Sequence, residues 1–404
     1  MKPLDGIRVL DLSRVLAGPY CTQFLGELGA EVIKVEPPGE GDQTRSWGPP
    51  FLDGGEAVYF MATNRNKRGV VVDLKTDRGR QIIAELAERA DVLVENFRPG
   101  TLERWGLDYA TLSTRNPRLI HLAISGFGQT GRYRDRAGYD LIAQGMGGVM
   151  ALTGEPDGRP VKVGFPVADL NGGTWGIIAV LMALQSRHRT GRGQYLDVSL
   201  LEAQLSWHIY AAGMHLQGVA GDSLRRFGSA HPMIAPYQAY PTADGWLNLA
   251  VGSQKLWHAC CAATGLDIAD DERFHDNPAR VAHREELNAL LEPVLRGKTT
   301  AQWLEVFEQA GIPAGPINEI ADIYADDWVT EREQVVELPH PVAGTYRGTG
   351  FPIKASDTPA GPSAAPPVLG QDTRAVLAEL GYPTAAIDEL LADQIVAQAP
   401  TEQP

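Results

Sequence analysis

The spacing of apolar residues along the first half of the chain predicts strands that alternate with helices. Apolar residues in short runs or at every second position predict strands at residues 7–12, 31–35, 69–74, 91–95 and 119–125. Helical spacing predicts helices at 18–28 and 77–89. Such alternation is typical of an α/β fold with a mostly parallel sheet covered by helices. Ligands of such a sheet bind beyond the carboxyl ends of its strands.

The second half of the chain has a different pattern. A strand at 246–251 and helices at 254–263, 285–295 and 300–309 predict a small α+β domain. Before it, residues 212–241 show little periodicity, and the run SAHPMIAPYQAY is interrupted by prolines, which predicts an extended linker. After it come a proline-rich spacer and two amphipathic helices, predicted at 359–367, 373–380 and 385–396.

The stretch Val161–Gly176 places one acid, Asp169, between a short alternating segment and a long apolar helix predicted to begin at Thr174. Asn171–Gly173 would supply flexible backbone and free N–H groups at the positive end of the helix dipole, which favours an ionised carboxylate. Asp169 alone has two interpretations. It is a helix cap, which is the commoner role of Asp in this position, or a functional acid.

Composition narrows the function classes. With 404 residues and 44% hydrophobic content, the chain can bury a large core, while its net charge of -14 argues against nucleic acid as a partner. Its three cysteines (Cys21, Cys260 and Cys261) have no metal-like spacing, nor have the histidines, so no metal and no disulfide framework are expected. We find no signal-peptide pattern and no run of about 20 apolar residues, so we expect a cytoplasmic protein without a membrane partner.

Basic residues gather where predicted strands end. They lie in NRNKRG (64–69), at Lys75, in NFRPG (96–100) and at Arg104. In an acidic protein such clusters suit phosphate groups, although a solvated basic edge explains them equally well.

Two glycine patterns do not indicate a dinucleotide site. The first strand is followed by SRVLAGP, which lacks the three glycines of a pyrophosphate-binding turn. GFGQTG (126–131) has those glycines, but the polar RYRDRAGYD that follows cannot open an apolar helix, so we predict a flexible loop near the site. Tyr139, in that polar run, is by itself best interpreted as a packed aromatic residue.

Several stretches taken together resemble family III CoA-transferases, the formyl-CoA and carnitine-CoA transferase group. The matching stretches are LDGIRVLDLSRVLAGPYCTQFLGELGAEVIKVEPPGEGD, NRNKRGVVVDLKT, DVLVENFRPG, AGYD, VADLNGG, TGRGQYLDVSLLEA and PPVLGQDTRAVLAELGY. They cover nearly the whole chain in order.

The resemblance implies that Asp169 is a nucleophile, with a CoA thioester as substrate and no tightly bound cofactor. Its carboxylate would form an aspartyl anhydride with the acyl group and then an aspartyl-CoA thioester. An Asp with an ordinary pKa of about 3.9 is ionised at neutral pH without a base. The resemblance also implies that CoA is bound by Val15, Leu16, Ala17, Lys75, Asn96, Phe97, Arg98 and Arg104, with Tyr139 near the reacting centre.

The same resemblance implies a Rossmann-like large domain and an interlocked homodimer. Residues 1–200 and 323–404 would form the large domain, 201–230 a linker and 231–322 the small domain. Two departures from the family pattern stand out. Pro37 replaces an Arg that contacts CoA in some relatives, and LAVGSQKLW lacks the glycine run of the formyl-CoA branch, which weighs against oxalate.

The sequence leaves alternatives for both the substrate and the class of reaction. GDQTRSWGPPF and SAHPMIAPYQAY most resemble transferases that use succinyl-CoA and small dicarboxylic or hydroxy acids, with Arg45, Arg65 or His231 as partners of a distal carboxylate. The alternative is an α-methylacyl-CoA racemase-like enzyme, in which a His stands where this chain has Tyr139. A phenol with a pKa of about 10 is a poor proton shuttle at neutral pH, so racemisation ranks second.

Overall fold

The computed structural model describes residues 1–221 and 223–399. The chain folds into two compact units, which are described one at a time. The large unit comprises Met1–Gly147, Gly164–His208 and Trp328–Pro404, and the small unit comprises Gly148–Val163 and Ile209–Asp327. The domain boundaries expected from the sequence stay a prediction.

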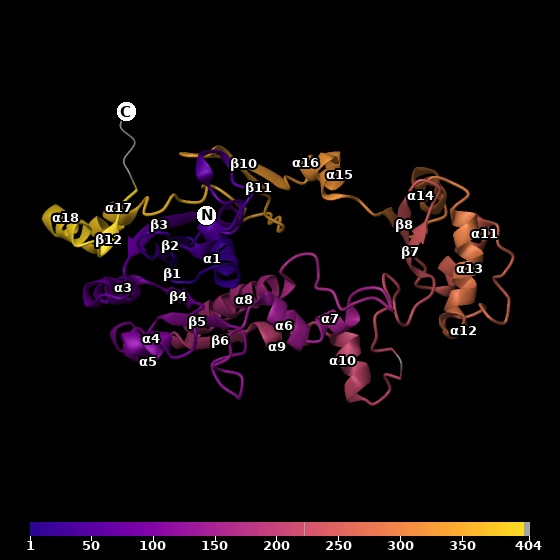
Figure 1. Cartoon of the computed structure of the whole chain (residues 1–404), viewed down its shortest axis with the longest axis horizontal. Helices are drawn as coiled ribbons and strands as arrows, with labels where there is room; N and C mark the ends of the chain where they lie inside the picture. The colour runs from indigo at the N-terminus through magenta and orange to yellow at the C-terminus, as the bar shows by residue number, and fades with distance from the viewer. Residues whose placement is uncertain (222, 400–404) are drawn as a thin grey trace. The chain divides into compact units, whose positions relative to one another are not determined.

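A seven-stranded sheet forms the centre of the large unit (Figure 1). Its strands lie in the order β12-β3-β2-β1-β4-β5-β6, and all neighbours are parallel except β12 and β3. The strands are β1 (Arg8–Asp11), β2 (Glu31–Glu36), β3 (Lys67–Val72), β4 (Val92–Glu95), β5 (Ile120–Ser125), β6 (Tyr195–Ser199) and β12 (Val396–Ala397). The expectation of a mixed α/β fold with a mostly parallel sheet is confirmed.

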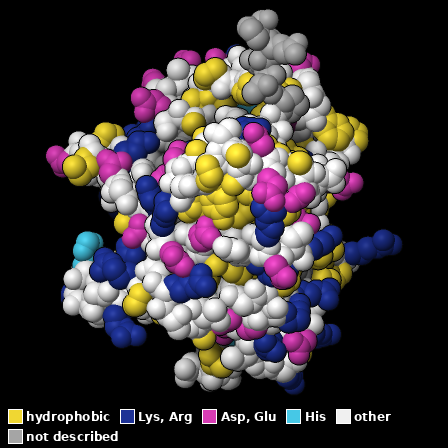
Figure 2. Space-filling view, turned by 90° about the vertical axis from the view of Figure 1, so that its left-hand side faces the viewer, with side chains coloured by type: hydrophobic (Ala, Val, Ile, Leu, Met, Phe, Trp, Pro, Cys, Tyr) yellow, Lys and Arg dark blue, Asp and Glu magenta, His cyan; other side chains and the backbone are white. Residues whose placement is uncertain are grey.

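Successive strand residues point to opposite faces, and each face has its own core. Val9, Val32 and Val94 pack with residues of α1 and α8 on one face, whereas Leu10 and Leu93 pack with residues of α3 and α17 on the other. Burial on both faces explains the apolar residues at the centre of these strands, with which the charged side chains of Asp11 and Lys34 are also buried. Figure 2 shows the side of this unit that carries α3 and α17, where acidic and basic side chains surround apolar ones.

The large unit also contains α-helices. They are α1 (Ala17–Glu27), α2 (Val58–Met61), α3 (Asp77–Arg89), α4 (Thr101–Trp105), α5 (Tyr109–Arg115), α6 (Asp140–Met146), α8 (Val167–Thr190), α9 (Leu200–Ser206), α17 (Thr373–Leu380) and α18 (Thr384–Ala392). Two short 3-10 helices, η1 (Gln43–Ser46) and η2 (Asp53–Gly55), follow β2. A separate antiparallel hairpin of β10 (Val335–His340) and β11 (Gly344–Thr349) completes the unit, and α16 (Asp327–Glu331) begins at its boundary.

The small unit has its own antiparallel sheet, in the order β7-β8-β9, with a core that includes Trp257, Trp303 and Phe307. Its strands are β7 (Tyr237–Pro241), β8 (Trp246–Ala250) and β9 (Ala314–Pro316). Its helices are α7 (Val149–Leu152), α10 (Ile209–Leu216), α11 (Gln254–Thr264), α12 (Asn277–Ala282), α13 (Arg284–Leu295), α14 (Thr300–Gln309) and α15 (Ile320–Ala325).

Three local predictions were wrong. The helix predicted to begin at Thr174 is α8, which begins seven residues earlier, at Val167. The predicted linker over 212–241 contains part of α10 and all of β7, because its Tyr240 packs into the core of the small unit. The helix predicted over 385–396 ends at Ala392, and Val396 instead pairs with β3.

One helix in the described part of the chain, α8, is long and apolar enough by length and composition to cross a membrane. Half of its most apolar window is buried, and it packs against α1, β5 and α9. These contacts are those of a core helix.

Candidate active site

A pocket of about 280 Å³ opens at the carboxyl ends of the parallel strands in the large unit. The strand order reverses between β1 and β4, and an open α/β sheet binds its ligands at such a switch point. Arg14–Ala17 follow β1 and Asn96–Pro99 follow β4, and both segments line the pocket. The topology therefore places the site where the strand pattern predicted it.

The pocket brings together eight of the residues selected from the sequence. They are Val15, Leu16, Ala17, Asn96, Phe97, Arg98, Tyr139 and Asp169. Lys75 and Arg104 do not belong to its lining: Lys75 lies in the turn after β3, and Arg104 lies in α4 and donates to Thr101. The roles given to these residues stay predictions.

Asp169 is the third residue of α8, whose N-cap position is occupied by Pro166. The interpretation of Asp169 as the helix cap was therefore wrong. Asp140, at the start of α6, takes that role, because its Oδ1 accepts hydrogen bonds from the backbone N–H groups of Ala168 (2.8 Å) and Asp169 (3.4 Å). Within the described residues, the Asp169 carboxylate itself accepts no hydrogen bond, so its oxygens are free to react.

The glycines after Asp169 serve packing rather than a flexible turn, so that expectation was wrong. Gly172 and Gly173 are buried inside α8. A Cβ on Gly172 would lie 2.5 Å from Leu200 of α9, and one on Gly173 would lie 2.7 Å from the carbonyl oxygen of Ala17. The absence of side chains lets α8 approach α1 and α9 closely, which holds Asp169 beside the loop that follows β1.

Burial raises the pKa of Asp169 to about 7, and the nearby Asp140 carboxylate adds to the effect. Both causes disfavour the ionised form. The expectation that this carboxylate keeps an ordinary pKa was therefore wrong. A carboxylate of this kind is more basic than a surface Asp and half ionised near neutral pH.

Four guanidinium groups line the same pocket: Arg14, Arg98, Arg134 and Arg136. Asp169 is the only acidic residue among its lining residues. A concentration of positive charge in a protein of net charge -14 indicates an anionic ligand. Only Arg98 was selected from the sequence. The run RYRDRAGYD, which follows the predicted loop near the site, was the signal that could have identified Arg134 and Arg136.

The loops after β1 and β4 are joined by the side chain of Asn96. Its Oδ1 accepts from the N–H of Arg14 (2.8 Å), and its Nδ2 donates to the carbonyl of Arg14 (2.6 Å). The Arg14 guanidinium lies over the Phe97 ring at 5.0 Å. Asn96 thus fixes the pocket wall with both polar atoms of its amide.

Two tyrosines lie near Asp169. Tyr139 is the N-cap residue of α6 and largely exposed at the pocket. Tyr59, in α2, was not selected from the sequence; burial and the carboxylates of Asp169, Asp140 and Asp42 raise its pKa to about 12. Its phenol therefore stays protonated at neutral pH and can donate a hydrogen bond.

The residues proposed from the sequence for a distal carboxylate lie elsewhere. Arg45 makes a two-point ion pair with Glu36 at 2.7 and 2.8 Å, and Arg65 is buried against Glu27 at 2.5 Å. His231 belongs to the small unit, where its ring lies between Tyr210 and Tyr237. Because Arg45 and Arg65 already neutralise buried carboxylates, neither is free to bind an anionic substrate.

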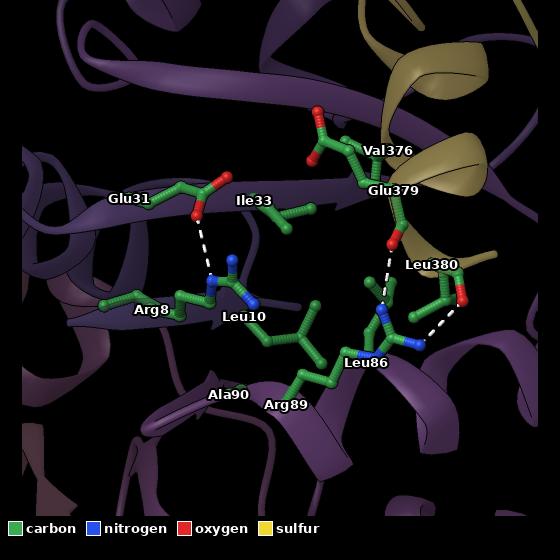
Figure 3. A pocket seen from close by; sticks show the side chains of 11 residues that line it. Arg8, Leu10, Glu31, Ile33, Leu86, Arg89, Ala90, Val376, Glu379 and Leu380 are labelled. Carbon is green, nitrogen blue, oxygen red and sulfur yellow. Dashed lines mark hydrogen bonds and ion pairs between the residues drawn. The ribbon is translucent and has the colours of Figure 1, made fainter. Parts of the chain in front are cut away.

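The large unit has a second pocket, of about 330 Å³ (Figure 3). It is lined by residues of strands β1 and β2 and by residues of helices α3 and α17, among them Arg89 and Leu380. Its floor is apolar, and its cations are engaged: Arg8 pairs with Glu31 at 3.1 Å, and Arg89 donates to the carbonyls of Glu379 and Leu380. It lacks a carboxylate free of hydrogen bonds and the four clustered guanidinium groups found around Asp169. Among the described residues, no group of three or more His, Cys, Asp or Glu side chains is placed to hold a metal ion.

Known proteins resemble this chain along most of its length. The sequence pattern that defines CoA-transferase family III matches residues 4–373. A succinate–glutarate CoA-transferase of Agrobacterium fabrum is 44% identical, over 94% of this chain and 96% of its own. The succinyl-CoA:glutarate CoA-transferase of Mus musculus is 42% identical, over 100% of this chain and 92% of its own. The crystal structure of a CaiB/BaiF family protein from Brucella suis superposes with a TM-score of 0.84 at 43% identity, covering 94% of this chain and 99% of its own.

Proposed function

The chain belongs to CoA-transferase family III, and we propose that it transfers CoA from succinyl-CoA to a dicarboxylic acid of about the size of glutarate. The observation that carries the proposal is the Asp169 carboxylate, which is unpaired within the described residues and lies in a pocket with four guanidinium groups. The names of the two relatives support the choice of donor and acceptor.

In the proposed mechanism, an oxygen of Asp169 attacks the thioester carbon of succinyl-CoA. The C–S bond breaks, which gives a succinyl-aspartyl anhydride and CoA thiolate. The thiolate attacks the aspartyl carbon and releases succinate, which leaves an aspartyl-CoA thioester. The acceptor carboxylate then attacks the aspartyl carbon of this thioester, which breaks the C–S bond and gives a second anhydride and CoA thiolate. The thiolate attacks the acyl carbon of the acceptor, which forms the new acyl-CoA and releases the Asp169 carboxylate. The raised pKa of Asp169 makes its ionised form a better nucleophile than an ordinary carboxylate.

Donor and acceptor share one feature, a carboxylate at the end away from the reacting carbon. We assign recognition of this distal carboxylate to Arg134 and Arg136, from the loop that follows GFGQTG. A guanidinium binds a carboxylate through two parallel hydrogen bonds, which selects a dicarboxylate over a monocarboxylate of the same length.

Mass spectrometry tests the covalent step. After succinyl-CoA is added without acceptor, a CoA adduct should appear on the peptide that contains Asp169, and Asp169→Asn should show neither adduct nor turnover. An adduct on another residue, or normal turnover of Asp169→Asn, would contradict the mechanism.

Kinetics test the recognition of the distal carboxylate. The wild type should prefer succinyl-CoA to butyryl-CoA and glutarate to pentanoate, which have the same number of carbons but no distal carboxylate. In Arg134→Gln/Arg136→Gln both preferences should fall by about tenfold or more, the typical effect of losing a charged hydrogen bond. An unchanged preference would exclude these two residues from substrate selection.

Racemisation is the alternative class, and the pocket does not favour it. No histidine is found among the residues that line the pocket with Asp169, which leaves Asp169 without the acid-base partner that the racemase relatives use. Solvent deuterium entering the α-carbon of a branched acyl-CoA would reinstate this alternative.

We further propose an interlocked homodimer with a Rossmann-like large domain and a cytoplasmic location. The exposed apolar residues Trp175, Ile178 and Met182 of α8 support association with a second copy. The strand order 3-2-1-4-5-6 supports the Rossmann-like description. Three free, buried cysteines agree with a reducing compartment.

A further inference from the structure

Val15, in the wall of the Asp169 pocket, has an unusual backbone conformation. Its φ is +68°, in the left-handed region that β-branched residues rarely adopt, because the side chain crowds the backbone. Such strain persists only where the surrounding structure imposes it, and it is concentrated at functional sites.

Hydrogen bonds hold both polar groups of the Arg14–Val15 peptide: Asn96 donates to the Arg14 carbonyl, and Asp42 accepts from the Val15 N–H. The N–H of Val15 points at the carboxylate of Asp42, 3.2 Å from Oδ2 and 3.4 Å from Oδ1. Asp42 is in turn fixed by Lys34 of β2, whose Nζ lies 3.1 Å from Oδ2, and by Thr44, whose N–H and hydroxyl both donate to Oδ1. The same Lys34 Nζ donates to the carbonyl of Ser13 at 2.9 Å.

This ion pair lies in the protein interior. The side chains of Lys34 and Asp42 are 0% and 1% exposed. Lys34 and the hydrogen bonds from Thr44 lower the pKa of Asp42 to about 2 against the effect of burial, so the carboxylate is ionised at neutral pH. A buried ion pair seldom stabilises a fold more than apolar side chains of the same size would. Its presence beneath a strained pocket residue therefore suggests a task other than stability.

We propose that Lys34 and Asp42 are positioning residues that hold Val15 in its left-handed conformation and thereby fix the Arg14–Ala17 wall of the pocket. This wall leads directly into α1, which begins at Ala17 without a side-chain cap. If Val15 relaxed to a negative φ, the path of the chain between Arg14 and Ala17 would change. The inference rests on the proposed function, because this wall then contacts the acyl-CoA that Asp169 attacks.

A neighbouring ion pair supplies the matched control. Lys67 of β3 is equally buried against Asp11, at 3.1 Å, and donates to the carbonyl of Pro19 at 2.9 Å, inside α1. It thus holds the same segment four residues further on, and its hydrogen bonds go to Asp11, Pro19 and Asn64 rather than to Val15. Loss of Lys67 should lower kcat/KM by a factor that does not depend on the conformation of Val15.

The experiment measures kcat/KM for succinyl-CoA after removal of the Lys34–Asp42 pair or of Lys67, in the wild-type background and in a Val15→Gly background. Glycine adopts φ = +68° without strain, so it does not need the pair. We expect Lys34→Met/Asp42→Leu to lower kcat/KM about tenfold or more in the wild-type background and less than about threefold in the Val15→Gly background. Lys67→Met should cost the same factor in both backgrounds. Equal losses from the Lys34–Asp42 pair in both backgrounds, or no loss, would overturn the proposal.

Two further measurements keep the inference separate from stability and from the proposed function. If the double variant does not fold, Asp42→Asn replaces it, with the same comparison between backgrounds. A crystal structure of Lys34→Met/Asp42→Leu, or of the Asp42→Asn variant that replaces it, should show a negative φ at Val15. An unchanged φ overturns the proposal whatever the kinetics. Failure of the wild type to transfer CoA from succinyl-CoA would refute the proposed function alone, since the φ of Val15 in the variant would still decide the positioning role.

Discussion

The ionisation of Asp169 should control the pH dependence of the reaction. Its pKa of about 7 lies inside the range in which the enzyme can be assayed. Attack on the thioester requires the ionised carboxylate, and the pKa that governs kcat/KM is that of the free enzyme. About a tenth of the molecules are ionised at pH 6 and about nine tenths at pH 8, as the one-site titration of a group with this pKa dictates. We therefore expect kcat/KM for succinyl-CoA to rise about tenfold between these two pH values and then to level off.

Asp140→Asn tests the cause of the raised pKa. The negative charge of Asp140 is the second cause after burial, so its removal should move the pH profile to lower pH. The amide oxygen of Asn can still accept from the N–H groups of Ala168 and Asp169, so α8 should keep its cap. The matched control is Asp108→Asn, which changes another capping Asp, that of α5, outside the pocket.

The assay is the initial rate of acyl-CoA formation at low succinyl-CoA and saturating acceptor, from pH 5.5 to 9. The wild type should show one ionisation near pH 7, Asp140→Asn a lower apparent pKa, and Asp108→Asn the wild-type profile. A rate that is flat from pH 6 to 8 would refute the link between Asp169 burial and catalysis. An unshifted profile in Asp140→Asn would leave burial as the only cause.

Three further predictions concern stability and the pocket wall. Asp169→Asn should raise the free energy of unfolding by up to about 4 kcal/mol at pH 8, because a pKa raised from 3.8 to about 7 means that ionised Asp169 destabilises the folded protein. This gain in stability should vanish as the pH falls from 7 to about 4. Urea unfolding of both proteins at pH 8 and at pH 4.5 measures it. Gly173→Ala should destabilise the protein by about 1–3 kcal/mol, since the new methyl group would meet the Ala17 carbonyl at 2.7 Å and Tyr20 at 2.9 Å; an unchanged melting temperature would contradict this close packing. Asn96→Leu should lower kcat/KM by about tenfold or more while circular dichroism stays unchanged, because both bonds from Asn96 to Arg14 are lost; wild-type kinetics would exclude the anchoring role.

Elements with a local signal were predictable from the sequence. The bounds of α3 and α17 are as predicted, and α14 runs from Thr300 to Gln309 as expected, because each has apolar residues on one face and definite ends. The apolar residues of the strands likewise identified the parallel sheet, since most side chains of strands buried on both faces are apolar. Asp169 was singled out by its isolation among apolar residues, and its role as a nucleophile came from the resemblance to the family.

What the sequence by itself did not determine depends on contacts between distant residues. The start of α8 is set by Asp140, 28 residues before Ala168, and Asn171–Gly173 are helical because α1 and α9 pack against them. Arg45 and Arg65 look in the sequence like any other basic residue, but Glu36 and Glu27 neutralise them in the fold. Arg134 and Arg136 reach the pocket of Asp169 only through the path of a loop.

The same distinction holds for the chemistry of the site. The sequence determined which carboxylate is available, whereas the tertiary structure decided its basicity, because a pKa depends on burial and on neighbouring charges. Residue type alone would leave Asp169 ionised and weakly nucleophilic. Packing of α8 into the large unit, with Asp140 at its amino end, places the pKa of that carboxylate near 7 in a pocket lined by four guanidinium groups.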